Sequence, residues 1–120
     1  MTKRAMDTAF AADVMLGRLA KWMRLAGYDT LYSRFFDDNE LVRLSRLTGR
    51  VLLTRDRELS ARRRVRSFLV QSEKVQEQLA EVLLAFPLQG PITPRCPECN
   101  SILAEVDKYQ IEGLVPTYIW

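Results

Sequence analysis

Acidic side chains in the first half of the sequence follow three short apolar segments, each near the point where the segment ends. In chain order they are Asp13, Asp37, Asp38, Asp56 and Glu58. Carboxylates that are brought together repel one another, and their pKa values rise unless a cation neutralises them. Mg²⁺ or Mn²⁺ suits such a group, because both ions prefer oxygen ligands. An ion held there can activate water and stabilise an in-line displacement at phosphorus.

The elements that must position these acids alternate between two patterns. The sequence predicts strands at residues 10–13, 29–33, 50–54 and 67–70. It predicts helices between Asp13 and Gly27, between Asp38 and Gly49, over 56–63 and over 72–86. Strands that alternate with helices form a parallel sheet with helices on both faces. Ligands bind such a sheet beyond the carboxyl ends of its strands, so we expect an α/β fold whose acids share one sheet edge.

Each acid also has a purely structural role open to it. Asp13, Asp38 and Asp56 precede helical segments, where an aspartate commonly caps the helix N-terminus. Asp37 would then be the solvated neighbour of Asp38, and Glu58 a first-turn acid that favours the helix dipole. Capping and metal binding remain alternatives for each residue alone. Acids at three successive strand ends favour a shared metal site.

Basic residues are concentrated in the same half of the chain. Residues 1–66 hold 15 Lys and Arg against 8 Asp and Glu, a net charge of +7, whereas residues 67–120 carry a net charge of −4. Nine arginines fall within residues 43–66, and the planar guanidinium suits phosphate oxygens. A solvated basic face is the alternative. Arg18, Arg55 and Arg57 lie near predicted strand ends and are the candidates for phosphate contacts. A metal site beside such a surface predicts a phosphodiesterase that acts on nucleic acid.

Length and composition exclude several classes of protein. With 120 residues, 48% hydrophobic and 28% charged, the chain fits one ordinary domain and is not disordered. It contains no histidine, which excludes Ser-His-Asp triads, His-ligated zinc and His acid–base catalysis. No apolar run reaches the roughly 20 residues that cross a bilayer, and no signal-peptide core follows Lys3 and Arg4. We expect a soluble, cytoplasmic protein with no membrane partner.

The two cysteines, Cys96 and Cys99, are too close together in the sequence for a disulfide between them to link distant parts of the fold. Their spacing is half of a structural zinc site, because zinc usually takes four ligands. The alternatives are a knuckle whose other ligands are missing or come from another chain, a redox pair, and a thiol pair without metal. A Pro- and Gly-rich stretch precedes the pair, so we place a boundary near residues 88–94. It separates a core, residues 1–88, from an appendage, residues 89–120.

Three blocks of sequence together resemble a known family. They are DVMLGRLAKWMRLAGYD at residues 13–29, Asp37-Asp38 followed by Glu40 and Leu41, and GRVLLTRDREL at residues 49–59. The chain resembles the Mut-seven C-terminal RNase domain, a family of PIN-like nucleases, over roughly residues 9–118. The resemblance implies a three-layer α/β/α PIN-like core, acids that hold a divalent metal, and endoribonuclease activity.

The resemblance also assigns roles by position. It implies that Asp13, Asp38, Asp56 and Glu58 are the PIN-like acids and that Thr54 supports the site beside Asp56. The family carries a C-terminal zinc ribbon built from two Cys-x-x-Cys pairs. Only Cys96 and Cys99 match within this sequence, so we expect a truncated or degenerate ribbon and leave zinc binding open.

We therefore predict a Mg²⁺- or Mn²⁺-dependent endoribonuclease that hydrolyses phosphodiester bonds of single-stranded RNA. Asp13, Asp38 and Asp56 would hold the metal, and Glu58 would complete a second metal position or orient the attacking water. The alternatives are an RNA-binding module that does not cleave and a protein-interaction module whose partner completes the knuckle. A protein partner or a homo-oligomer is compatible with either. We favour the enzyme, because a pure binder has no need of acids that repel phosphates.

Overall fold

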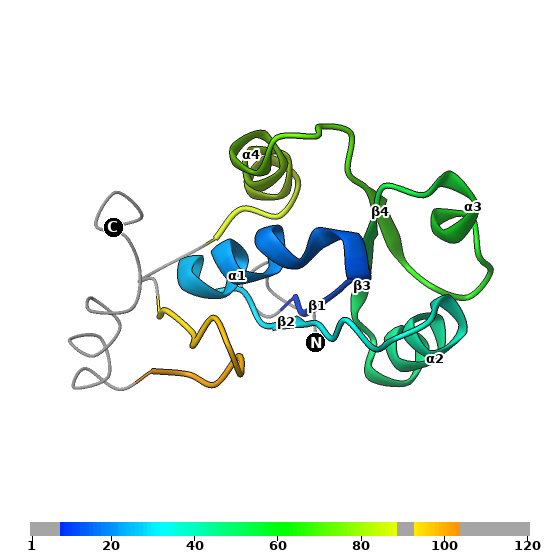
Figure 1. Cartoon of the computed structure of the whole chain (residues 1–120), viewed down its shortest axis with the longest axis horizontal. Helices are drawn as coiled ribbons and strands as arrows, with labels where there is room; N and C mark the ends of the chain where they lie inside the picture. Colours follow the sequence, from blue (N-terminus) through cyan, green and yellow to red (C-terminus); the bar gives the residue numbers. More distant parts are fainter. Residues whose placement is uncertain (1–7, 89–92, 104–120) are drawn as a thin grey trace.

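The computed structural model describes residues 8–88 and 93–103, and a sheet of parallel strands lies at its centre (Figure 1). The strands are β1 (Phe10–Ala12), β2 (Thr30–Leu31), β3 (Val51–Thr54) and β4 (Ser67–Leu69), in the spatial order β2-β1-β3-β4. Phe10 of the central strand pairs with Thr30 on one side and with Val51 on the other. The predicted parallel sheet is confirmed. Residues 89–92 and 104–120 of the predicted appendage lie outside the described residues.

Helices lie between successive strands and after the last one. A short 3-10 helix, η2 (Val14–Leu16), leads into α1 (Gly17–Ala26), and the other helices are α2 (Asp38–Thr48), α3 (Arg57–Ser60) and α4 (Val75–Ala85). In the described part of the chain, none of them is long and apolar enough to cross a membrane.

Alternating side chains of the buried strands supply two separate hydrophobic cores. Phe10, Ala12 and Leu53 lie in a core with residues of α1 and α4, such as Leu19 and Val82. The intervening strand residues point to the other face of the sheet, because successive side chains of a strand alternate. There Ala11 and Leu52 pack with Leu41 and Val42 of α2 and Leu59 of α3. This arrangement confirms the predicted three-layer α/β/α fold.

The order of the strands fixes where a ligand can bind. The chain runs from β1 to β2 on one side and then crosses β1 to reach β3 on its other side. The loops after β1 and β3 therefore diverge, and this point is where open parallel sheets bind their ligands. Asp13 directly follows β1, and Thr54 is the last residue of β3.

Helix ends agree with the sequence more closely than helix lengths do. Gly27 and Gly49 end α1 and α2 with φ values of 106° and 67°, a left-handed conformation that glycine adopts without strain. The helix predicted over 56–63 is shorter, because α3 ends at Ser60. Arg63, which was expected in this helix, lies beyond its end. Its carbonyl oxygen accepts a hydrogen bond of 3.1 Å from Nε of Arg46.

Two leucines of the helices are exposed rather than packed in the core. Leu47 is 72% exposed and Leu83 is 38% exposed. Leu47 lies six positions after the buried Leu41, a spacing that turns it well away from the buried face, because a helix has 3.6 residues per turn. The neighbours of Leu41 on that face are Val42 and Ser45, both buried.

A tight turn around Cys96 and Cys99 docks against the end of α1 and the outer edge of β2. Asn100 amide N–H donates to the carbonyl oxygen of Cys96 at 2.8 Å, and Arg95 and Ile102 form an antiparallel bridge. We call residues 95–102 the knuckle.

Two side chains join the knuckle to the core. The Asn100 Oδ1 atom accepts from the Thr30 amide at 3.0 Å. Arg24 is only 5% exposed and donates from Nε to the Thr30 carbonyl at 2.9 Å and from a terminal nitrogen to the Pro97 carbonyl at 2.7 Å.

Candidate active site

Asp13 is a buried carboxylate at the point where the strand order reverses. It is 6% exposed, and its amide donates to the Leu53 carbonyl at 2.9 Å, which continues the pairing of β1 with β3. The Asp13 side chain makes no capping hydrogen bond to the helix that follows, although the residue occupies the N-cap position. The capping alternative for Asp13 is therefore wrong.

Few groups balance the charge of Asp13. Its Oδ2 atom accepts a hydrogen bond of 2.8 Å from the Thr54 hydroxyl. In residues 8–88 and 93–103 the ion pairs are Lys21–Glu98 and Arg50–Asp29, so neither involves Asp13. A buried charge without an ionic partner is costly. A bound cation is the kind of partner that would compensate it.

Thr54 connects Asp13 to Asp56. Its side chain is fully buried, and its Oγ1 atom accepts from the Asp56 amide at 2.9 Å. Because the Asp56 amide already donates to this oxygen, the hydroxyl proton is directed to Asp13. Thr54 thus holds one oxygen of the Asp13 carboxylate in place.

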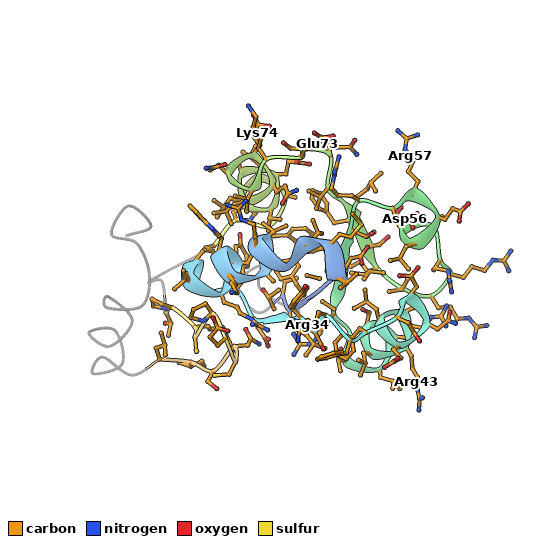
Figure 2. The ribbon with its side chains drawn as sticks, viewed as in Figure 1. Arg34, Arg43, Asp56, Arg57, Glu73 and Lys74 are labelled. Atoms are coloured by element: carbon orange, nitrogen blue, oxygen red, sulfur yellow. The ribbon has the colours of Figure 1, made fainter. Side chains whose placement is uncertain are left out.

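Asp56 caps α3, as the structural alternative proposed. Its Oδ1 atom accepts from the amides of Glu58 at 2.9 Å and Leu59 at 3.4 Å, and its side chain is exposed at the start of α3 (Figure 2). Both bonds reach the same oxygen, so Oδ2 remains accessible to a further ligand. Glu58 is exposed in the first turn of the same helix.

The two acids before α2 exchange the roles expected of them. Asp37 is the N-cap, with Oδ1 accepting from the Glu40 amide at 2.8 Å. Asp38 is the first helical residue, and its side chain is exposed. The expected cap at Asp38 with Asp37 as its neighbour is therefore wrong by one position, which leaves the Asp38 carboxylate without a capping bond.

Within the described residues, hydrogen bonds join four of the predicted site residues in series: Asp13, Thr54, Asp56 and Glu58. In the described part of the chain no three His, Cys, Asp or Glu side chains are arranged closely enough to hold a metal ion. The donor chemistry nevertheless fits Mg²⁺ or Mn²⁺, because Mg²⁺ typically binds through one or two carboxylates, several waters and the phosphates of the substrate. The ligand set of Asp13, Asp38 and Asp56 stays a prediction.

Exposed arginines are numerous around α2 and α3. Arg18 of α1 is exposed, as are Arg55 and Arg57, and Arg57 points outward from α3 (Figure 2). Other exposed arginines come from α2 and the loop after α3. We call the exposed arginines of residues 43–64, without Arg18, the arginine surface: Arg43, Arg46, Arg55, Arg57, Arg62, Arg63 and Arg64. None of them forms an ion pair with an acid within residues 8–88 and 93–103.

The knuckle presents both cysteines as free thiols, with Cys99 exposed. The hydrogen bond between Cys99 Sγ and Ser101 Oγ, 3.3 Å apart, lowers the pKa of Cys99, and the nearby charge of Arg24 adds to this effect. A lowered pKa favours the thiolate, which is the form that binds metals. Two thiolates are half of a zinc ligand set, so zinc binding stays a prediction.

Sequence reasoning missed Arg24 and the loop after β2. Arg24 lies at an ordinary polar position of an amphipathic helix, and its partners are distant in sequence. In the loop after β2, Phe35 is 78% exposed, whereas its half-buried neighbour Phe36 packs against the core. Two adjacent aromatic residues before a helix cap were a usable signal, since a short connecting loop rarely buries both of its large apolar side chains.

These residues form a PIN-like α/β/α domain with a buried acid where the strand order reverses. A family model described as the Mut7-C RNAse domain matches residues 8–120, and the chain belongs to that family. The match confirms the resemblance found in the sequence and indicates a nuclease-type, RNA-related role. Comparisons with curated proteins and with solved structures found no match.

Proposed function

We propose that the chain is a divalent-metal-dependent endoribonuclease that hydrolyses phosphodiester bonds of single-stranded RNA. The observation that carries this proposal is Asp13, a buried carboxylate at the ligand-binding edge of the sheet whose side-chain partner is the Thr54 hydroxyl. The description of the family as an RNAse domain supports the same activity. The exposed arginines support a polyanionic substrate.

Each acid has a distinct role in this proposal. Asp13 is the principal ligand for Mg²⁺ or Mn²⁺, and Thr54 fixes its orientation through the 2.8 Å hydrogen bond. Asp38 and Asp56 contribute oxygens that no cap uses, and Glu58 orients the attacking water. The bound ion supplies a more acidic water and neutralises charge that develops on the phosphate. Asp37 supports the site indirectly, because it caps the helix that carries Asp38.

Removal of the divalent ion tests the proposed chemistry. We expect end-labelled single-stranded RNA to be cut with Mg²⁺ or Mn²⁺ and to remain intact with EDTA, and we expect added metal to restore cutting. The readout is the length distribution of the labelled fragments on a gel. Cutting that continues unchanged in EDTA would contradict metal dependence. Binding without cutting under every condition would favour the non-catalytic RNA-binding module instead.

The arginine surface gives a second prediction, which concerns salt. The double variant Arg55→Gln/Arg57→Gln should bind single-stranded RNA more weakly at low salt, because two phosphate contacts are lost. The slope of log affinity against log salt should fall by about 0.7 for each lost contact. Fluorescence anisotropy with a labelled RNA measures this slope.

Lys74→Gln is the matched control for this measurement. It removes one positive charge, against two in the double variant, from an exposed side chain that points outward near α4 (Figure 2). An equal loss of slope per charge removed in Lys74→Gln would mean that overall charge, rather than the arginine surface, accounts for RNA binding.

A further inference from the structure

Two large apolar side chains are exposed next to the candidate active site. Met15 is 81% exposed and Phe35 is 78% exposed. Both belong to segments that leave the sheet at its carboxyl edge, since Met15 is two residues after Asp13 and Phe35 is four residues after β2. Exposed apolar groups at such an edge are candidates for contact with a ligand.

The two segments are fixed to each other. The Tyr32 hydroxyl donates to the Val14 carbonyl at 2.8 Å, which connects the loop after β2 to the turn after Asp13. The ring of Tyr32 also lies over Gly17, where an added Cβ would come within 2.8 Å of the Tyr32 hydroxyl oxygen. Gly17 therefore permits this close approach.

Phe35 is held outward by its neighbours in the loop. Its amide donates to the Ser33 hydroxyl at 3.2 Å, and the Phe36 amide donates to the Ser33 carbonyl at 3.3 Å. Phe36 packs against the core between the sheet and α2. With Phe36 pointing inward, Phe35 must point outward. Its exposure is therefore a property of an anchored turn.

The chemistry around Phe35 suits a nucleobase. The Arg34 guanidinium carbon lies 5.0 Å from the centre of the Phe35 ring, a cation–π arrangement that places a positive charge beside an aromatic surface. Single-stranded RNA is recognised by stacking of unpaired bases on aromatic rings and guanidinium planes, together with contacts to the phosphates. An aromatic ring, a cation and a flexible apolar side chain provide these contacts together.

We propose that Phe35, with Arg34 and Met15, binds an unstacked base of single-stranded RNA next to the phosphate positioned at Asp13. This inference rests on the proposed function for its substrate and names the subsite that selects single strands. A base held in a duplex cannot stack on Phe35, so the subsite disfavours double-stranded RNA.

Binding without cleavage tests the subsite separately from the nuclease activity. RNA that contains the fluorescent base 2-aminopurine is titrated with the full chain in EDTA, where the proposed chemistry is absent. We expect the wild-type chain to quench the fluorescence by stacking. The variant Phe35→Ala should lose this quenching and bind about tenfold more weakly, whereas Phe35→Trp should retain both.

The matched control is Leu84→Ala, because Leu84 is as exposed, at 83%, but belongs to α4. It should leave both readouts unchanged. RNA with an abasic position in place of 2-aminopurine should bind wild type and Phe35→Ala equally. Absent quenching in wild type, or an equal loss of affinity on abasic RNA, would overturn the subsite. Intact quenching in a chain that never cuts RNA would overturn the proposed enzyme and leave the subsite standing.

Discussion

Replacement of Asp13 by Asn should reduce metal-dependent RNA cleavage by about 10³-fold while the protein stays folded. The substitution removes the charge that we propose as the ligand of the cation, and the loss of a group that stabilises developing charge costs about 10²–10³ in rate. The amide oxygen of the new side chain can still accept from the Thr54 hydroxyl, which now donates to Asp13 at 2.8 Å. The measurement is the single-turnover rate of RNA cleavage at saturating Mn²⁺.

The same substitution should affect stability in the opposite direction. Asp13 is buried, and no ion pair neutralises it within the described ranges, so the loss of its charge removes a desolvation cost. We expect the melting temperature of Asp13→Asn without metal to equal or exceed that of wild type. Stability that is gained where activity is lost is typical of functional residues.

Glu73→Gln is the control for the Asp13 variant. Glu73 is an exposed acid in the loop before α4 (Figure 2), outside the acids that we place at the site. It should change the cleavage rate by less than about twofold, because an exposed acid away from the site interacts only weakly with it. Equal losses in both variants, or full activity in Asp13→Asn, would contradict the assignment of Asp13.

Replacement of Arg24 by Met should lower the free energy of unfolding by about 3 kcal/mol. Arg24 donates to the carbonyl oxygens of Thr30 and Pro97, and each buried acceptor that loses its partner costs about 1–3 kcal/mol. Burial lowers the pKa of Arg24. The guanidinium nevertheless remains charged at neutral pH, because the ordinary pKa of arginine lies far above 7. Met keeps the apolar length of the side chain, so the loss is confined to the polar contacts.

Urea unfolding measures this loss, and alkylation of Cys96 reports whether the knuckle has come away from the core. The control is Lys21→Met on the same helix, which breaks only the exposed Lys21–Glu98 pair at 3.6 Å. An exposed pair of this kind contributes less than about 1 kcal/mol. If both variants unfold at the same urea concentration, the Arg24 contacts do not hold the knuckle.

The sequence was sufficient to predict the sheet and the place of Asp13, because alternating apolar strands and helices restrict the topology to few choices. The sequence could not decide whether Asp37 or Asp38 caps the helix, because a helix boundary is uncertain by one or two residues. The contact between Thr54 and Asp13 joins residues 41 positions apart. Neither the hydrophobic periodicity nor the spacing of residues in the sequence can reveal a hydrogen bond between residues so far apart.

Arg24 shows the same limit more sharply. Its position in α1 fits a solvated polar face, but its Pro97 partner lies 73 residues away in the sequence. Asp29, which was expected inside the strand that β2 forms, lies just before it. Its carbonyl oxygen accepts from the Phe10 amide at 2.8 Å, and its side chain accepts from Arg50 at 2.9 Å and from Asn100 at 2.6 Å. These partners are distant in the sequence, so local patterns cannot report them.

The docking of the knuckle on β2 has a consequence for self-association. An edge strand with free backbone groups is a template on which the strand of another molecule can form, and this is a common route to aggregation. On the outer side of β2, the Thr30 amide is bonded to Asn100 and its carbonyl to Arg24. Both groups that a foreign strand would need are already occupied by side chains. In the part of the chain that the structure describes, side chains rather than a further strand thus close this edge of the sheet to strand addition.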